Sequence, residues 1–90
     1  FLLEQNYPNP FNPETTLQYF LPEQSFVNIS IYDMFGREIK NLINTTQEMG
    51  QRSIKWNATN HDGKIVSGGI YFYKIQAGAY LKTGKMTLLK

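Results

Sequence analysis

Few side chains in this sequence are of the types that carry out catalysis. His61 is the only histidine and lies beside Asp62 in a polar stretch, and the sequence contains no cysteine. A zinc site or a catalytic triad needs several such groups brought together. The serines follow no strand–turn–helix pattern of the kind that exposes a hydrolase nucleophile. We therefore predict that the chain is not an enzyme and has no catalytic residue.

The oxygen-bearing side chains between residues 57 and 63 are the best candidates for a metal site. Calcium usually takes about six to eight oxygen ligands, and this stretch supplies one carboxylate, that of Asp62. Asparagine and aspartate also favour turns, because their side chains bond to their own backbone. The sequence predicts turns here, with no metal and no cofactor.

The aromatic residues suggest a different chemistry, the stacking of flat rings on the apolar faces of sugars. Such a platform would leave several rings exposed side by side, whereas packing residues would be buried. We interpret the rings mainly as packing residues, with sugar binding as the alternative. The candidates are Tyr7, Phe11, Tyr32, Phe35, Tyr71, Tyr73 and Tyr80.

Length and charge set further limits. The 9 basic and 7 acidic residues of the 90-residue chain are spread without a basic block, so we expect no nucleic-acid partner. No apolar run approaches the ~18 residues of a membrane span. The length suits one domain. Because the chain begins at Phe1 without an initiator methionine or a signal peptide, we expect it to be a piece of a longer protein.

The elements that would position any site begin with a proline-rich segment. Pro8, Pro10 and Pro13 exclude a helix and push the residues before them towards extended geometry. Tyr7 and Phe11 are large apolar groups that can pin such a segment onto a folded body. The sequence predicts an extended, Pro-rich lead-in over residues 1–14 of a single domain that spans residues 1–90.

Alternating apolar and polar residues predict strands in the rest of the chain, most clearly around Ile29. A hairpin turn is expected at residues 33–36, a polar loop at 44–50 and a bulge or early strand end near Asn41. Trp56 is the predicted core anchor. Large side chains at both parities of residues 70–77 indicate a central strand covered on both faces. The expected strands are 15–21, 27–32, 37–43, 51–56, 70–77 and 80–89, with 64–66 at most a very short one.

This arrangement predicts an all-β fold. No helical stripe of useful length is present, and about seven short strands are separated by regularly spaced turns. These features are typical of an antiparallel immunoglobulin-like β-sandwich. A small barrel is the alternative architecture.

Several stretches together resemble a bacterial family, the type A C-terminal sorting domains of the type IX secretion system. The proline segment, the Tyr-Asp-x-x-Gly-Arg turn and a basic-apolar-basic terminus are jointly specific in this order. The resemblance covers essentially the whole chain, although related immunoglobulin-like modules, including one in flagellar hook-capping proteins, share parts of the later pattern. The matching stretches are Leu3–Pro13, Ile31–Arg37, Trp56–Asn57 with Asp62–Gly63, Ser67–Tyr73 and Lys85–Lys90.

The resemblance implies a C-terminal secretion signal domain for a larger cargo fused at its N-terminus. The type IX secretion machinery would carry that cargo from the periplasm across the outer membrane, to the medium or the cell surface. In this family a sortase-like cysteine peptidase commonly removes the domain, here near or before Phe1, and sometimes attaches the cargo to surface lipopolysaccharide. The motif positions carried over are Pro8, Asn9, Pro10, Gly36, Arg37, Gly69, Tyr71, Lys85 and Lys90.

The lysines near the C-terminus have two interpretations on physical grounds alone. They can present charge to a partner that adds a strand to the last strand's edge. They can equally protect an exposed edge from pairing with other chains. A second function class also stays open, a structural or adhesive immunoglobulin-like module that packs on a secreted enzyme or binds polysaccharide.

Overall fold

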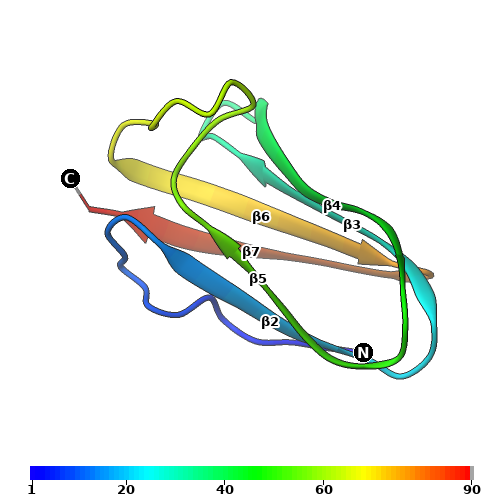
Figure 1. Cartoon of the computed structure of the whole chain (residues 1–90). Coiled ribbons are helices and arrows are strands. Elements are labelled where there is room, and N and C mark those ends of the chain that lie inside the picture. The colour runs from blue at the N-terminus through cyan, green and yellow to red at the C-terminus, as the bar shows by residue number, and fades with distance from the viewer. Residues whose placement is uncertain (90) are drawn as a thin grey trace.

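The computed structural model describes residues 1–89, which form two antiparallel sheets packed face to face (Figure 1). The described chain contains no helix that could cross a membrane. The predicted all-β, immunoglobulin-like sandwich of about seven strands is confirmed. One sheet has the order β1 (Leu2–Leu3), β2 (Thr15–Leu21), β5 (Gly50–Trp56). The other has the order β4 (Glu38–Gln47), β3 (Ser25–Tyr32), β6 (Gly69–Ala77), β7 (Tyr80–Leu88).

Two predicted segments differ from the structure. Residues 64–66 form no strand, and Ile65 makes only a single bridge to Thr59. The predicted loop at 44–50 is wrong at residues 44–47 and at residue 50, because β4 continues to Gln47 and β5 begins at Gly50. Threonines at 45 and 46 favour extended backbone and pair with β3. The irregularity expected near Asn41 is present as two register shifts that leave Ile39 and Leu42 without a direct partner in β3.

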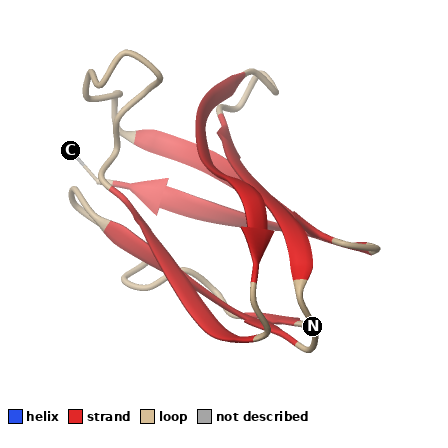
Figure 2. Cartoon of the chain, turned by 45° about the vertical axis from the view of Figure 1, so that its right-hand side comes forward, coloured by secondary structure: helices blue, strands red, loops and turns tan. Residues whose placement is uncertain are grey.

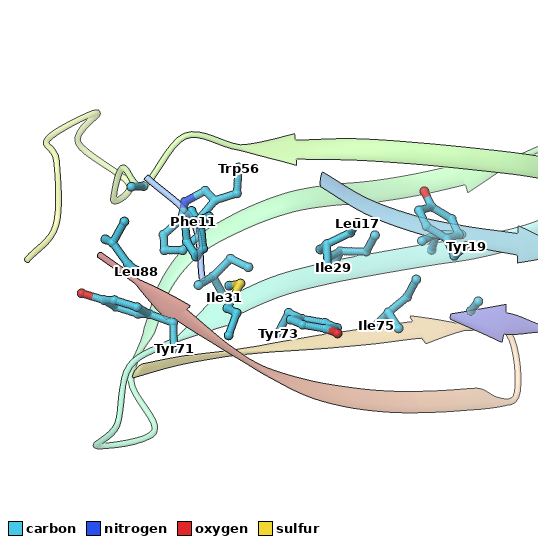
Figure 3. Close-up of a cluster of buried hydrophobic side chains, with 14 of the residues drawn as sticks. Phe11, Leu17, Tyr19, Ile29, Ile31, Trp56, Tyr71, Tyr73, Ile75 and Leu88 are labelled. Carbon is cyan, nitrogen blue, oxygen red and sulfur yellow. The ribbon is translucent and has the colours of Figure 1, made fainter. Parts of the chain in front are cut away.

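The core lies between the sheets and is richest around Trp56 (Figure 3). The Trp56 ring packs against Phe11 at a centroid distance of 5.8 Å and against Tyr71 at 5.4 Å. Its indole N–H donates to the backbone oxygen of Thr59 at 2.9 Å, so the only polar atom of this buried ring is satisfied. Trp56 is therefore the core anchor that the sequence predicted.

Strand β6 occupies a central position between β3 and β7, as predicted, but only one of its faces is buried. Tyr71, Tyr73 and Ile75 point into the core, whereas Phe72 on the opposite face is 38% exposed. The prediction of two-sided burial is wrong, because no third layer covers the outer face of this sheet. A sandwich of two layers leaves that face to solvent.

The lead-in crosses from one sheet to the other. Its first residues follow β2, where the Tyr7 N–H donates to the Thr16 oxygen at 3.0 Å. Further on, the Phe11 N–H donates to the Thr87 oxygen at 3.0 Å, which attaches the segment to the outer edge of β7. The Phe11 ring is 1% exposed and the Tyr7 ring 79% exposed. Of the two predicted anchors, only Phe11 pins the lead-in through its side chain, while Tyr7 holds it through its backbone.

A buried polar cluster fixes the bend of the lead-in. Asn6 Nδ2 donates to Thr15 Oγ1 at 3.0 Å, and Thr15 Oγ1 donates to the Pro8 oxygen at 2.8 Å. The Asn6 and Thr15 side chains are both buried. Buried polar groups with partners specify one arrangement, because any other arrangement would leave them unsatisfied. The cluster therefore determines where the segment leaves β2.

The facing residues Tyr73 and Gly84 show how closely β6 and β7 pack. The two residues pair across the strands, and the Tyr73 ring lies over the glycine. A Cβ atom added at Gly84 would overlap the Cζ atom of Tyr73. The ring is buried and has little room to move away. A glycine is therefore required opposite this tyrosine.

We expect Phe11→Ala to lower the free energy of unfolding by about 3–5 kcal/mol, because it empties a buried ring site against Trp56. Tyr7→Ala, in the same segment, should change it by less than about 0.5 kcal/mol, since that ring is exposed. Denaturant unfolding of the two variants measures both values. Equal losses would contradict the role of Phe11 as the side-chain anchor.

Gly84→Ala should lower the free energy of unfolding by about 1–3 kcal/mol, because the added methyl group displaces the Tyr73 ring. Thr83→Ala on the same strand, at an exposed position, serves as the matched control and should cost less than about 0.5 kcal/mol. Thermal unfolding compares the two. A Gly84→Ala variant as stable as the control would show that the ring moves freely.

Candidate recognition surface

The strand ends bring the motif stretches together. Because neighbouring strands are antiparallel, β3, β5 and β7 finish at the end of the sandwich where β2, β4 and β6 begin (Figure 2). Thr15 and Trp56 are paired at this end of one sheet. Gly69 and Leu88 are paired at this end of the other. The lead-in bend, the β3–β4 turn, the β5–β6 loop and the end of β7 therefore meet at one pole, which we call the motif end.

The β3–β4 turn at the motif end is held by the Asp33 side chain. Its Oδ1 accepts the N–H groups of Phe35 at 2.9 Å and Arg37 at 3.0 Å, and its Oδ2 accepts Arg37 Nε at 2.8 Å. Gly36 has a φ of 80°, which residues with a Cβ rarely adopt. The Arg37 guanidinium lies 5.2 Å from the centroid of the Phe35 ring. The turn is thus an ordered platform for exposed side chains.

The same contacts shift the titration of Asp33. Burial acts to raise the pKa of the Asp33 carboxyl. The hydrogen bonds from the N–H groups of Arg37 and Phe35 and from the Arg37 guanidinium outweigh burial, so the pKa lies below the ordinary value of 3.8. A carboxylate with a lowered pKa in the folded state contributes stability above its unfolded pKa. That contribution is lost as the pH falls through the folded pKa.

A second turn at the motif end repeats this geometry. Asn60 Oδ1 accepts the N–H groups of Asp62 at 2.9 Å and Lys64 at 3.1 Å, and Gly63 has a φ of 77°. The two sequences share the pattern Asp/Asn-x-x-Gly-Arg/Lys. This shared spacing is the signal in the sequence that marks the second turn. Two side-chain-capped turns therefore project from neighbouring connections.

Two contacts join these turns across the motif end. Lys40 Nζ donates to the Asn60 oxygen at 3.2 Å, and His61 Nε2 lies 3.4 Å from Glu38 Oε2. A cleft of about 390 Å³ lies beside the β3–β4 turn. The turn and the β5–β6 connection line it, and Tyr71 of β6 lies at its base. Among the lining residues are Met34, Phe35, Arg37, Asn60, Ile65, Val66 and Ser67.

Exposed apolar side chains surround this cleft. Met34 is 67% exposed, Phe35 83% and Ile65 65%. Large apolar groups on an ordered turn form an exposed patch of the kind that protein partners cover. The sequence alone marks Phe35 only as a possible ring of a sugar platform, and it does not mark Met34 or Ile65 as site residues. Their role became visible only when the turn and the β5–β6 loop came together in space.

The predicted motif residues of the lead-in and the β6 start have distinct contacts. Asn9 Oδ1 accepts the Thr87 N–H at 3.0 Å, the Pro8 oxygen accepts Thr15 Oγ1, and Pro10 is exposed. Tyr71 is buried against Trp56, and its hydroxyl donates to the Ser67 oxygen at 2.5 Å. Tyr71 therefore supports the motif end from the core, whereas Pro8, Asn9 and Pro10 are exposed and belong to the bend of the lead-in. Gly69 begins β6 at the rim of the cleft.

The predicted lysines occupy a different surface. Lys85 pairs with Phe72 on the outer face of the four-stranded sheet, and Lys90 lies outside the described residues. The lead-in occupies part of the outer edge of β7. There the Phe11 N–H donates to the Thr87 oxygen, and the Leu89 N–H donates to the Phe11 oxygen at 2.8 Å. Strand addition at that segment would require the lead-in to leave. Lys85 is thus available to a partner through the sheet face.

The aromatic candidates for a sugar platform are separated. Phe11, Tyr71 and Tyr73 are buried in the core, and the exposed rings of Phe35 and Tyr80 lie near opposite ends of the sandwich. Within residues 1–89 no group of three or more histidine, cysteine, aspartate or glutamate side chains is placed to hold a metal ion. The motif end instead offers a cleft bordered by exposed apolar side chains and two side-chain-capped turns, which suit binding of a protein.

We predict that Asp33→Asn keeps the turn but loses its acid dependence, because an amide oxygen can still accept the Phe35 N–H, as Asn60 does for Asp62. The variant should be less stable than the parent at neutral pH, and the difference should shrink as the pH falls below 3.8. Unfolding measured in steps from neutral to acid pH tests this. A constant difference across that range would contradict the assignment.

Comparison with solved structures supports the fold. One neighbour is PorZ of Porphyromonas gingivalis, described as an essential bacterial surface component of the type-IX secretion system, with a TM-score of 0.63 and 23% identity over 94% of this chain and 11% of that one. Another is FLGD from P. aeruginosa, with a TM-score of 0.63 and 24% identity over 82% of this chain and 58% of that one. The chain thus spans well under two thirds of either protein.

Comparison with curated proteins gives no match. The model of one protein family, described as the secretion system C-terminal sorting domain, matches residues 5–89. The match covers nearly the whole chain and every motif position described by the structure, from Pro8 to Lys85. The chain therefore belongs to the family of secretion-system C-terminal sorting domains.

Proposed function

We propose that residues 1–90 act as one unit, a signal that directs an N-terminally fused cargo across the outer membrane through the type IX secretion machinery. The family match over residues 5–89 supports a sorting signal, and the resemblance of the motifs points to the type IX route. The cargo reaches the medium or the cell surface by way of the periplasm. The domain itself performs no catalysis in this role.

The observation that carries the proposal is the convergence of the motif stretches at one pole. The lead-in bend, the Asp33 turn, the start of β6 and the end of β7 are far apart in sequence and adjacent in the fold. Packing alone does not explain why Met34 and Phe35 stand exposed there. A partner that covers them on binding does.

Processing by a sortase-like cysteine peptidase follows from the same proposal. The N-terminal residues of the domain run along β2, so a linker before Phe1 leaves the sandwich near the pole opposite the motif end. Recognition and cleavage would then use different regions of the molecule. The peptidase would cut near or before Phe1 and, in some cases, attach the cargo to surface lipopolysaccharide.

The adhesive alternative has less support. A sugar-binding platform needs neighbouring exposed rings, and the seven candidate rings divide between the core and separate parts of the surface. Three exposed apolar side chains, Met34, Phe35 and Ile65, instead line the cleft beside the turn at residues 33–37. We therefore favour the sorting signal as the role of this surface.

A suitable test must leave the sandwich intact. Deleting residues 85–90 would remove buried Met86 and Leu88 and the partners of Phe11, so loss of export could reflect unfolding. Point substitutions of exposed turn residues avoid this problem. Met34 and Met49 are a matched pair, 67% and 63% exposed, in turns at opposite poles.

We predict that Met34→Ser combined with Phe35→Ser reduces export of a fused reporter by about tenfold or more, because binding hot spots contribute about 2 kcal/mol or more. Met49→Ser should leave export unchanged. Reporter in the medium and at the cell surface is quantified against total reporter, with unfolding of each fusion as a control for stability. Equal export from all three fusions would refute a recognition role for the motif end.

Cleavage is tested separately on the exported reporter. We expect its new C-terminus to lie near or before Phe1 and to appear only in cells that contain the peptidase, and mass spectrometry of the released or surface-bound reporter measures it. Exported reporter that still carries residues 1–90 intact in such cells would contradict processing. Export itself would be unaffected by that result.

A further inference from the structure

The outer face of the four-stranded sheet carries a compact group of apolar and basic side chains near the motif end. In the β6–β7 register, Phe72 pairs with Lys85 and Lys74 pairs with Thr83. These four residues therefore form a square on one face of two neighbouring strands, with the lysines at opposite corners. Tyr32 of β3 pairs with Phe72 and extends the apolar side of the square.

A shallow hollow of about 280 Å³ lies on this face. Phe72, Lys74, Thr83 and Tyr32 line it, together with Met34 from the Asp33 turn. The turn thus separates two hollows, the cleft of the motif end and this one. A partner that covers Met34 reaches both.

The two lysines have no acidic partner. The ion pairs within residues 1–89 join Arg37 to Asp33, Lys55 to Glu14 and His61 to Glu38, and none includes Lys74 or Lys85. Glu38 lies in the same row but is separated from Lys85 by β3 and β6, about 14 Å at the usual strand spacing. Asp33 also lines the hollow, and its carboxylate is paired with Arg37. The square therefore presents two lysines that make no ion pair within residues 1–89, beside an apolar surface.

The arrangement favours a peptide over a sugar. A sugar would need the open face of a ring, and Lys74 Nζ already lies 5.1 Å from the centroid of the Tyr32 ring. Two residues at diagonal positions of adjacent antiparallel strands, as these lysines are, lie about 7–8 Å apart. Side chains at alternate positions of an extended peptide are about 6.8 Å apart and share a face. The lysine separation matches that spacing.

We propose that this face binds an extended acidic segment of a partner protein with the pattern acid-x-acid. Its two carboxylates pair with Lys74 and Lys85, which lie at opposite corners of the square beside the hollow. The inference rests on the proposed function, since it gives the chemistry of the segment that would recognise the sorting signal. It gives Lys85 a role at the sheet face rather than at the strand edge.

The test titrates two synthetic peptides into the isotope-labelled chain and follows the backbone amides by NMR at physiological salt. One peptide has glutamates at alternate positions. The other has the same composition with the glutamates adjacent. The first should shift the amides of Tyr32, Phe72 and Thr83 and bind at least about fivefold more tightly than the second, because only its carboxylates reach both lysines together.

Lys74→Glu and Lys85→Glu should each weaken binding of the first peptide by about fivefold to tenfold. Lys82→Glu is the matched control, with the same charge change on the same strand. Lys82 pairs with Ile75, which faces the core, and lies beside a different hollow near Phe1. Its substitution should therefore change binding by less than about twofold. The NMR spectra report whether each variant is folded.

Equal weakening by Lys82→Glu, equal binding of both peptides, or shifts confined to another face would overturn the proposal. So would binding of an acidic oligosaccharide, such as oligogalacturonate, at this face in place of the peptide. Export of the reporter fusion is measured in parallel. If the double variant Lys74→Glu with Lys85→Glu is still exported, the recognition role of this face is overturned and the sorting function is not. If the unaltered fusion is not exported, the sorting function itself is refuted.

Discussion

The contact of Phe11 with Trp56, together with the pairing of its backbone to the end of β7, is the constraint on which the rest of the structure depends. Neither sheet alone encloses the Trp56 ring, because β5 ends at that residue and β7 ends beside it in the other sheet. The lead-in supplies the missing wall and ties the sheets together through two backbone hydrogen bonds. Once both sheets are joined at this point, the connections that carry the motifs must lie around it.

This constraint explains why the exposed and the buried motif residues lie at the same pole of the sandwich. Tyr71 is buried and bonds to Ser67, and the exposed Asn9 ties the lead-in to Thr87. Met34 and Phe35 project from the same pole. The Asp33 and Asn60 turns are both capped by their own side chains, so the surface is ordered before any partner arrives. Preorganised surfaces lose less conformational entropy on binding than flexible loops do. The motif end therefore has the properties of a signal that is read in its folded form.

The sequence predicted what depends on local periodicity. The alternation around Ile29 gave β3, and the turn residues Asp33 and Gly36 gave the hairpin. The long extent of β4 and the exposed outer face of β6 were not predicted, because both depend on which strands become neighbours. The partner of the lead-in was unpredicted for the same reason: Phe11 and Thr87 are separated by almost the whole chain. Of the site, the motif positions were found by resemblance, but Met34 and Ile65 became site residues only in three dimensions.

The central claim is that this fold carries an export signal, and one measurement tests it most directly. Residues 1–90 are fused behind a signal peptide and a fluorescent reporter in a bacterium with the type IX machinery, and the reporter is located in cells with and without that machinery. The account predicts reporter in the medium or on the surface only when the machinery is present. A folded fusion that stays in the periplasm of both strains would contradict it.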